Sequence, residues 1–181
     1  MGVISFREAK SSDAGRLGVL HVTSWRETYA GLLPSQILDG LSAEARSTMW
    51  RAILEDPANC GGTGVFVAES DDKVVGFGAC GDQRDPALKG RGFDGEVRAI
   101  YVLQSHQRAG VGSSLMSLMA QDLLGRGRTA ATVWVLRENA AARLFYERLG
   151  GALASEKSDE LSGVTVFEVA YGWSDLFALV R

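Results

Sequence analysis

A short glycine-containing turn near the middle of the chain, Gln107–Gly112, carries the clearest chemical signal. It joins the apolar, β-branched run Glu96–Val102 to an apolar-periodic helix that begins at the turn. The first N–H groups of a helix have no partner within the helix, and the macrodipole is positive there. Because Gly110 and Gly112 lack a Cβ, an anion can approach the main chain closely. The turn therefore predicts a binding site for a phosphate-bearing cofactor.

The spacing of the turn separates three kinds of phosphate loop. A P-loop requires a Lys-Ser or Lys-Thr pair, whereas Gly112 is followed by Ser113 and Ser114. A dinucleotide fingerprint requires a third glycine where this chain has Leu115. That fingerprint also lies near the start of a doubly wound sheet, whereas this turn lies past the middle of the chain. The remaining pattern is Gln/Arg-x-x-Gly-x-Gly/Ala, which Gln107–Gly112 matches.

The elements after the turn support this interpretation. Ala131–Leu136 is a second apolar, β-branched run, so strand, turn, helix and strand form a right-handed crossover between parallel strands. A second helix then runs from Asn139, a good N-cap, to Gly150, a good C′ residue. Its apolar stripe is expected to contain Leu144, Phe145 and Leu149.

These two motifs resemble the hallmarks of the GNAT superfamily of N-acetyltransferases. The first is the turn Gln107–Gly112, and the second is Asn-x-x-Ala-x-x-x-Tyr-x-x-Leu-Gly, which matches Asn139–Gly150. The resemblance is specific over about residues 64–150 and looser from Val3 to Tyr171. It implies a single α/β (mixed α+β) GNAT-like domain over residues 1–181, with a mostly antiparallel sheet, one central parallel strand pair and helices on both faces.

The resemblance also implies a function. It indicates an acyltransferase that moves an acetyl group from acetyl-CoA to a primary amine by direct attack. The identity of the acceptor is left open, and it can be a small molecule or an amine of a peptide or protein. The oligomeric state is also left open, with a homodimer as one possibility. The rival hypothesis from another class is a catalytically silent acyl-CoA-binding module or sensor.

Cofactor contacts carry over to the positions that match the two motifs. The main chain of the central strand is expected to bind the pantetheine arm, and the turn the pyrophosphate. The predicted contacts are Ile100, Tyr101, Val102, Gln107, Arg108, Ala109, Gly110, Val111, Gly112, Ser113, Asn139 and Tyr146. Arg108 can equally be a solvated loop residue, and the side chains of the three strand residues are expected in the core.

Glu96 is the candidate general base. A lysine-like amine with a pKa of ~10.4 is rarely neutral at pH 7, so a group that removes its proton assists attack. The resemblance points to Glu96, which opens the central strand. The two-residue period of a strand predicts that it shares a face with Arg98, Ile100 and Val102. The alternative is a structural carboxylate, solvated or paired with Arg98; the sequence also leaves open whether Glu96 would act directly or through water.

Tyr146 is the candidate partner of the leaving thiolate. It lies one position off the Leu144–Phe145 stripe, so it is expected to border the core. A phenol with a pKa of ~10 is a weaker acid than a thiol near ~8.5, so a hydrogen bond to sulfur is favoured over full proton transfer. The alternative is a tyrosine that only packs the helix.

Trp25 and Tyr29 are the candidate substrate contacts. They lie four residues apart on one helix face and precede a Gly-Leu-Leu-Pro element. The resemblance assigns this turn to the wall of the acceptor pocket, and packing is the alternative.

Composition excludes several classes. A chain of 181 residues with 46% hydrophobic content and net charge −3 has no basic field for nucleic acid, and no apolar run approaches the ~18 residues of a membrane span. Without a secretory signal, a cytoplasmic location is expected. Two histidines and two cysteines without ligand spacing argue against a metal site and against a covalent acetyl-enzyme. Cys60 and Cys80 are expected to be reduced thiols, although a disulfide is possible.

The remaining elements follow from periodicity and turn residues. A strand is expected at Val3–Arg7, a helix capped by Asp13 from there to Tyr29, and helix at Gln36–Glu55 with a break near Gly40. Residues 64–70 and 74–80 should form a hairpin, and 82–95 a mobile loop. Short antiparallel strands at 152–155 and 165–171 should close the sheet around a polar loop.

Overall fold

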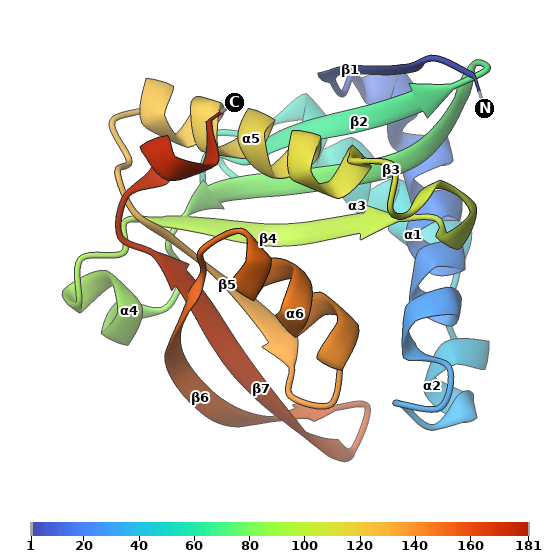
Figure 1. Ribbon diagram of the computed structural model, residues 1–181. Helices are drawn as coiled ribbons and strands as arrows, with labels where there is room; N and C mark the ends of the chain where they lie inside the picture. The colour runs from blue at the N-terminus through green and yellow to red at the C-terminus, as the bar shows by residue number, and fades with distance from the viewer. Residues whose placement is uncertain (1, 181) are drawn as a thin grey trace.

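The fold is built on one mixed β-sheet. The structure is a computed structural model that describes residues 2–180. Within that part the sheet has seven strands in the order β1-β2-β3-β4-β5-β7-β6, and β4 and β5 are its parallel pair (Figure 1). The strands are β1 Ile4–Glu8, β2 Gly64–Ser70, β3 Lys73–Asp82, β4 Gly95–Val102, β5 Ala131–Leu136, β6 Ala152–Leu161 and β7 Val164–Trp173. The predicted fold class, mostly antiparallel with a central parallel pair, is confirmed.

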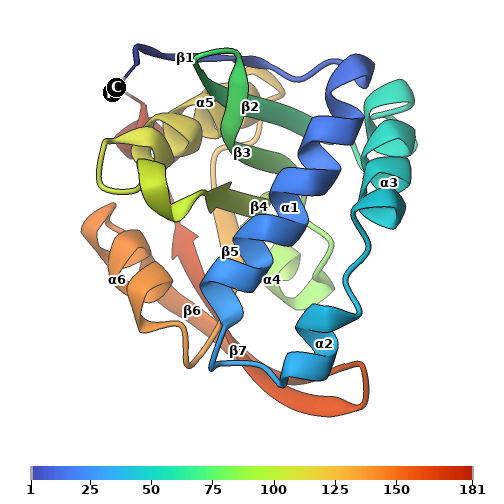
Figure 2. The same ribbon diagram turned by 90° about the vertical axis from the view of Figure 1, so that its right-hand side faces the viewer.

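Helices cover both faces of the sheet. They are α1 Ala14–Tyr29, α2 Ser35–Asp39, α3 Ala43–Glu55, α4 Pro86–Gly90, α5 Val111–Gly125 and α6 Ala140–Arg148, with 3₁₀ turns at Ser11–Asp13, Gln104–His106 and Leu176–Leu179. Figure 2 shows α1 and α3 on one side of the sheet and α6 on the other. The core accordingly has one apolar layer under α1 and α3, around Phe77, and another under α5 and α6, around Met119.

Local sequence accounts for most of these boundaries. Asp71 and Asp72, at φ 49° and 61°, make the two-residue turn of the predicted β2–β3 hairpin. The predicted break near Gly40 separates α2 from α3, and the Ser42 Oγ caps α3 by accepting a hydrogen bond from the Ala45 N–H at 3.1 Å.

The prediction for Asp13 was wrong in its chemistry. Helix α1 does begin after Asp13, but the carboxylate does not cap it. Instead Asp13 Oδ2 accepts hydrogen bonds from Arg7 Nη1 at 2.7 Å and from the Lys10 N–H at 2.8 Å. The carboxylate is buried, and a guanidinium compensates its charge more strongly than helix N–H groups would.

The predicted loop at 82–95 contains more structure than expected. Asp85 caps the short helix α4 by accepting hydrogen bonds from the Ala87 and Leu88 N–H groups. Gln83 Nε2 donates to the Gly95 carbonyl and to Thr132 Oγ1, which ties the start of the segment to β4 and β5. The local sequence of this glycine-rich segment does not predict these hydrogen bonds, because they are made to residues of other elements.

The last two strands are also longer than predicted. β6 and β7 have ten residues each and join through a turn in which Ser162 and Gly163 have φ values of 50° and 78°. The residues expected to form a polar loop therefore pair as strand, with Lys157 opposite Glu168. Most of the β6 side chains in this part are exposed, so they show little of the apolar alternation that indicates a strand.

Candidate active site

The parallel strands β4 and β5 pair over only three residues before they separate. Their register is Gly95 with Ala131, Glu96 with Thr132 and Val97 with Val133, although β4 continues to Val102 and β5 to Leu136. Past Val97 the edge of β4 that faces β5 therefore has no neighbouring strand among the described residues. Around this gap both strands line one cleft, with Arg98 and Tyr101 from β4 and Trp134, Val135 and Leu136 from β5.

A β-bulge at Arg98 sets the orientation of the β4 side chains. Ala79 pairs with Ala99 and Cys80 with Val97, which leaves Arg98 as the extra residue. Tyr101 packs in the layer under α1 and α3, whereas Ile100 and Val102 pack under α5. The prediction that Glu96 shares a face with Ile100 and Val102 was wrong, because the bulge reverses the alternation and puts Glu96 on the side of Tyr101.

The predicted anion turn does open directly onto a helix. Gly110 is the N-cap of α5 with φ 81°, and the first helical hydrogen bond runs from the Ser114 N–H to the Gly110 carbonyl at 3.0 Å. The N–H groups of Val111, Gly112 and Ser113 precede that bond and make no backbone hydrogen bond among the described residues. A Cβ added at Gly110 would meet no atom within 4 Å, so the space beside this glycine is open.

The two glycines of the turn have different roles. A Cβ on Gly112 would lie 3.1 Å from Phe145 Cζ, so this glycine makes room for the packing of α6 against α5. Gln107 Nε2 donates to the Val102 carbonyl at 3.0 Å and fastens the turn to the end of β4. Arg108, at φ 61°, and Ala109 are exposed at the tip of the turn.

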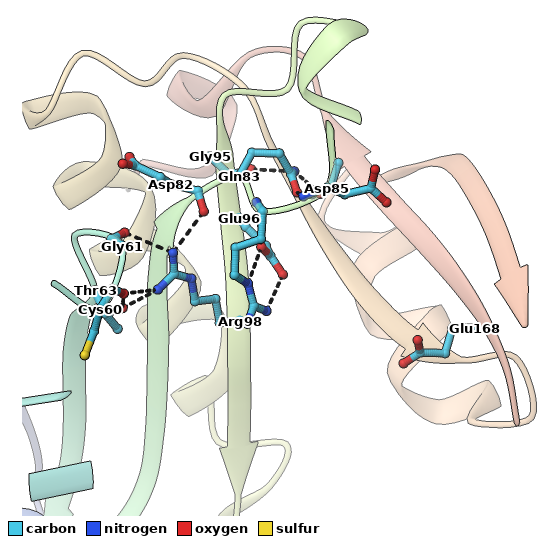
Figure 3. A network of polar contacts seen from close by, with 12 residues as sticks. Cys60, Gly61, Thr63, Asp82, Gln83, Asp85, Gly95, Glu96, Arg98 and Glu168 are labelled. Atoms are coloured by element: carbon cyan, nitrogen blue, oxygen red, sulfur yellow. Dashed lines mark hydrogen bonds and ion pairs between the residues drawn. The ribbon is translucent and has the colours of Figure 1, made fainter. Parts of the chain in front are cut away.

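Glu96 is buried on β4 (Figure 3), and its carboxylate is hydrogen-bonded to Arg84 from the β3–β4 segment. Arg84 Nη2 donates to Glu96 Oε1 at 2.6 Å, Arg84 Nε donates to Oε2 at 2.9 Å, and the Arg84 N–H donates to Oε2 at 3.2 Å. The pairing with Arg98 that the sequence left open was wrong. Arg84 lies 12 residues away on an irregular segment, so no spacing rule signals it.

Arg98 has a different function at the bulge. Its guanidinium donates to the Cys60, Gly61 and Asp82 carbonyl oxygens and to Thr63 Oγ1, and so it holds the segment before β2 against β3 and β4 (Figure 3). Burial, with the nearby Arg84 charge, lowers the pKa of Arg98 below its usual value. Arg98 therefore has a structural role, in which its guanidinium binds backbone carbonyl oxygens and not the Glu96 carboxylate.

Tyr146 lies deeper than predicted. Its side chain is only 5% exposed, whereas Leu144 of the expected apolar stripe is 46% exposed. The ring packs against Tyr171 and Trp173, each with its centroid 6.0 Å away. Its hydroxyl makes no hydrogen bond with any described residue, and burial raises the pKa of the phenol well above its usual value. The buried face of α6 therefore contains Tyr146, with Phe145 and Leu149 beside it, in place of Leu144, because this face packs against side chains of β5 and β7.

Asn139 caps α6, as predicted. It is buried, and its Oδ1 accepts a hydrogen bond from the Ala142 N–H at 3.1 Å.

Trp25 and Tyr29 line a cleft on the α1 side of the sheet. Their rings meet edge to face with centroids 5.0 Å apart, and the Tyr29 hydroxyl is hydrogen-bonded to the Tyr101 hydroxyl at 3.1 Å. The cleft has a volume of about 710 Å³, and Glu96, Arg84 and Tyr101 form its inner wall. Burial, and to a smaller extent the charge of Glu168, raise the pKa of Tyr29.

The opposite wall of the cleft comes from the β6–β7 hairpin, which the sequence did not predict at this length. It contributes Lys157, Asp159, Glu160 and Glu168. Figure 3 shows the Glu168 side chain directed from β7 toward the side of β4 that carries Glu96 and Arg98. The only sequence signal for this wall was a run of charged residues, which a solvated loop would also carry.

The described residues offer no cluster suited to a metal ion and no membrane-spanning helix, and both cysteines are free thiols. Residues 2–180 contain no group of three or more His, Cys, Asp or Glu side chains that could hold a metal ion. Cys60 and Cys80 are both free, and burial raises the pKa of the Cys80 thiol far above its usual value. Among the same residues no helix has the length and apolar character needed to cross a bilayer.

Comparisons with known proteins agree with this geometry. The sequence profile of the Acetyltransferase (GNAT) family matches residues 20–151. The uncharacterized N-acetyltransferase YuaI of Bacillus subtilis is 34% identical over 178 residues, which cover 98% of this chain and 96% of that protein.

Solved structures show the same fold. The PaiA N-acetyltransferase from Thermoplasma acidophilum in complex with coenzyme A superposes with a TM-score of 0.72 at 17% identity, covering 94% of this chain and 99% of that one. The acetyltransferase YncA from Salmonella typhimurium, solved with acetyl-CoA, gives a TM-score of 0.69 at 18% identity, covering 97% and 95%. The profile match and the full-length relative together establish that this chain belongs to the acetyltransferase (GNAT) family and is an acyltransferase.

Proposed function

We propose that this protein transfers the acetyl group of acetyl-CoA to a primary amine, by direct attack of the amine on the thioester. The observation that carries the proposal is the separation of β4 from β5 past Val97. An exposed helix N-terminus lies at the end of β4, and the cleft opens on the α1 side. A cofactor and an acceptor can therefore approach the same gap from different sides.

The residues around the turn suit a coenzyme A moiety. The N–H groups of Val111, Gly112 and Ser113 can donate to phosphate oxygens, and Arg108 adds an exposed positive charge. The edge of β4 at Ile100–Val102 has main-chain groups directed toward the gap, which an extended amide arm can use as an added strand would. Bound acetyl-CoA supplies the activated acetyl thioester.

Glu96 is the proposed base. A primary amine of pKa ~10.4 is neutral in roughly one molecule in ~2,500 at pH 7, a cost of about 4.6 kcal/mol that a base offsets. Arg84 supplies one hydrogen bond to Glu96 Oε1 and two to Oε2. Because a carboxylate oxygen accepts about two hydrogen bonds, Oε1 keeps one site for a water molecule or an amine N–H. Glu96 would therefore accept the proton through that oxygen.

Tyr146 is the proposed partner of the departing sulfur. Its raised pKa keeps the phenol protonated at neutral pH, and its hydroxyl has no hydrogen-bond acceptor among the described residues. It can therefore donate a hydrogen bond to the negative charge that develops on sulfur. A covalent acetyl-enzyme on Cys80 is disfavoured, because a thiol with a raised pKa is a poor nucleophile.

One observation favours the rival function of a silent acyl-CoA-binding module. The three hydrogen bonds from Arg84 give Glu96 a structural role as well, since they anchor the β3–β4 segment. A module that only binds acyl-CoA would retain the turn and this anchor without transferring the acetyl group.

Two measurements together test the proposal. Isothermal titration calorimetry should detect binding of acetyl-CoA, and a thiol-release assay over a panel of amines and peptides should detect acceptor-dependent formation of coenzyme A. Binding without acceptor-dependent thiol release across the panel would favour the silent module. Absence of binding would reject the assignment of the turn.

A further inference from the structure

The cleft contains two carboxylates in opposite situations. Glu96 accepts three hydrogen bonds from Arg84. The Glu168 carboxylate accepts no hydrogen bond from any described residue, and its ion pair there is with Lys157, at 3.3 Å between Nζ and Oε2. The Glu168 side chain is nevertheless only 22% exposed. A partly buried carboxylate with unused acceptor sites, directed into a cleft, suits a ligand that donates hydrogen bonds and carries positive charge.

Lys157 does not fully compensate the negative charge of the β6–β7 wall of the cleft. Its Nζ lies 3.3 Å from Glu168 and 3.7 Å from Asp159, so one ammonium serves two carboxylates. The same Nζ lies 4.3 Å over the Trp134 ring. A primary ammonium is thus already held in the cleft by carboxylate and aromatic groups, and net negative charge remains beside it.

The aromatic side of the same cleft adds two hydroxyl groups, those of Tyr29 and Tyr101. The Tyr29 and Tyr101 hydroxyls share one hydrogen bond, so lone pairs on these oxygens stay available. Tyr29, Tyr101 and Glu168 all line this one cleft. An ammonium has three N–H donors, and the two carboxylate oxygens of Glu168 and the two phenol oxygens in the same cleft are acceptors.

The proton of the reacting amine is assigned to Glu96, which leaves Glu168 for a group that stays charged. Glu168 already pairs with the Lys157 ammonium, and a carboxylate stabilises the charged form of an amine beside it. Glu96 and Glu168 belong to opposite walls of the cleft, on β4 and β7 (Figure 3). An acceptor can therefore present one amine toward Glu96 while a second cationic group reaches Glu168.

We infer that Glu168 is a specificity-determining residue that holds a second, non-reacting cationic group, and that the preferred acceptors are aliphatic amines with two positive charges. This inference rests on the proposed function for the identity of the reacting end. The binding of the second charge does not depend on acetyl transfer, so it can be measured separately.

The test compares 1,4-diaminobutane with n-butylamine, which has the same carbon chain and a single charge. Chemical-shift titration without acetyl-CoA should give tighter binding of the diamine to the native protein, by about tenfold. In Glu168→Gln that advantage should disappear, while butylamine binding stays within about twofold. Glu160→Gln is the matched control, because Glu160 lines the same cleft from β6 and is exposed. It should keep most of the preference.

Kinetics provide a second readout where the amines are acetylated. Glu168→Gln should raise the KM for the diamine by about tenfold with kcat nearly unchanged, and leave both constants for butylamine nearly unchanged. Equal affinity of the native protein for the two amines would overturn the inference, as would an equal loss for both amines in Glu168→Gln. Failure of acetyl-CoA binding would reject the proposed function instead and would leave the amine titration as the test of Glu168.

Discussion

Arg84 and Glu96 form a two-point ion pair at the inner wall of the cleft, with Arg84 Nη2 2.6 Å from Glu96 Oε1 and Arg84 Nε 2.9 Å from Oε2. The Arg84 side chain is 64% exposed, whereas Glu96 is buried. The pair therefore joins a surface segment to the central strand. It gives Glu96 two possible functions, anchor and base, which substitutions at the two residues can separate.

Glu96→Gln should lower kcat/KM by about 10²-fold near neutral pH, because the amide cannot accept the amine proton. The deficit should shrink as pH rises and the neutral fraction of the amine grows. Arg84→Gln removes the anchor and leaves the carboxylate, so it should retain activity within about fivefold while lowering the melting temperature. Steady-state rates from pH 6 to 9 for both variants decide the matter. Equal losses in the two variants would make Glu96 a structural carboxylate.

Tyr146→Phe should reduce kcat by about 10-fold to 10²-fold, which corresponds to roughly 1.4–2.7 kcal/mol, with little change in acetyl-CoA affinity. Its melting temperature should stay near the native value, because the hydroxyl makes no hydrogen bond with described residues. Tyr171→Phe is the matched control. Its hydroxyl bonds Glu147 and Arg143, so its loss should cost about 1–2 kcal/mol of stability without slowing the chemical step. Stopped-flow measurement of that step compares the two, and full activity of Tyr146→Phe would reduce Tyr146 to packing.

Gly110→Ala should weaken acetyl-CoA binding at least tenfold, because a methyl group would occupy the open space beside the turn. At φ +81° any side chain is strained, so the variant needs a control with the same strain. Gly127→Ala provides it at the other end of α5, where φ is +75° and an added Cβ also meets nothing within 4 Å. Both should lose about 1 kcal/mol of stability. Calorimetric affinities that fall equally in both variants would argue against the turn as the phosphate site.

His21 should make the protein less stable in mild acid. It lies on the buried face of α1 and accepts a hydrogen bond from Trp50 Nε1, and burial together with the charge of Arg46 lowers its pKa from 6.5 to about 4. As pH falls below 6.5 the unfolded chain binds a proton at His21 that the folded chain excludes until about pH 4. The free energy of unfolding should therefore decrease across this range, by on the order of 3 kcal/mol in total.

His21→Asn keeps a hydrogen-bond acceptor for Trp50 and removes the titration. Urea unfolding of both proteins between pH 7 and 4 measures the difference in slope. Arg7 lowers the pKa values of Asp13 and Glu69, so protonation of these carboxylates in acid also decreases the free energy of unfolding. This decrease is the same in both proteins and cancels in the comparison. Parallel slopes for the native protein and the variant would show that His21 does not titrate in this way.

The order and type of most elements between β2 and α6 could be predicted from local sequence. The hairpin turn at Asp71–Asp72, the strand before the Gln107–Gly112 turn and the N-cap Asn139 all depend on residues close to one another in the chain. Local conformational preference and hydrogen bonding decide such features, so periodicity and turn residues are sufficient to predict them. The same local motifs carried the resemblance to the family.

The tertiary structure alone decided how the candidate site is assembled. The bulge at Arg98 depends on the register between β4 and β3, and it moves Glu96 to the face of Tyr101. Arg84 reaches Glu96 only because Gln83 fastens its segment to Gly95 and Thr132. The β6–β7 hairpin, which brings Glu168 across from β4, pairs through its backbone despite its polar sequence. Each of these features depends on contacts between residues that are distant in the chain. The free energy of such contacts cannot be predicted from any single segment of the sequence.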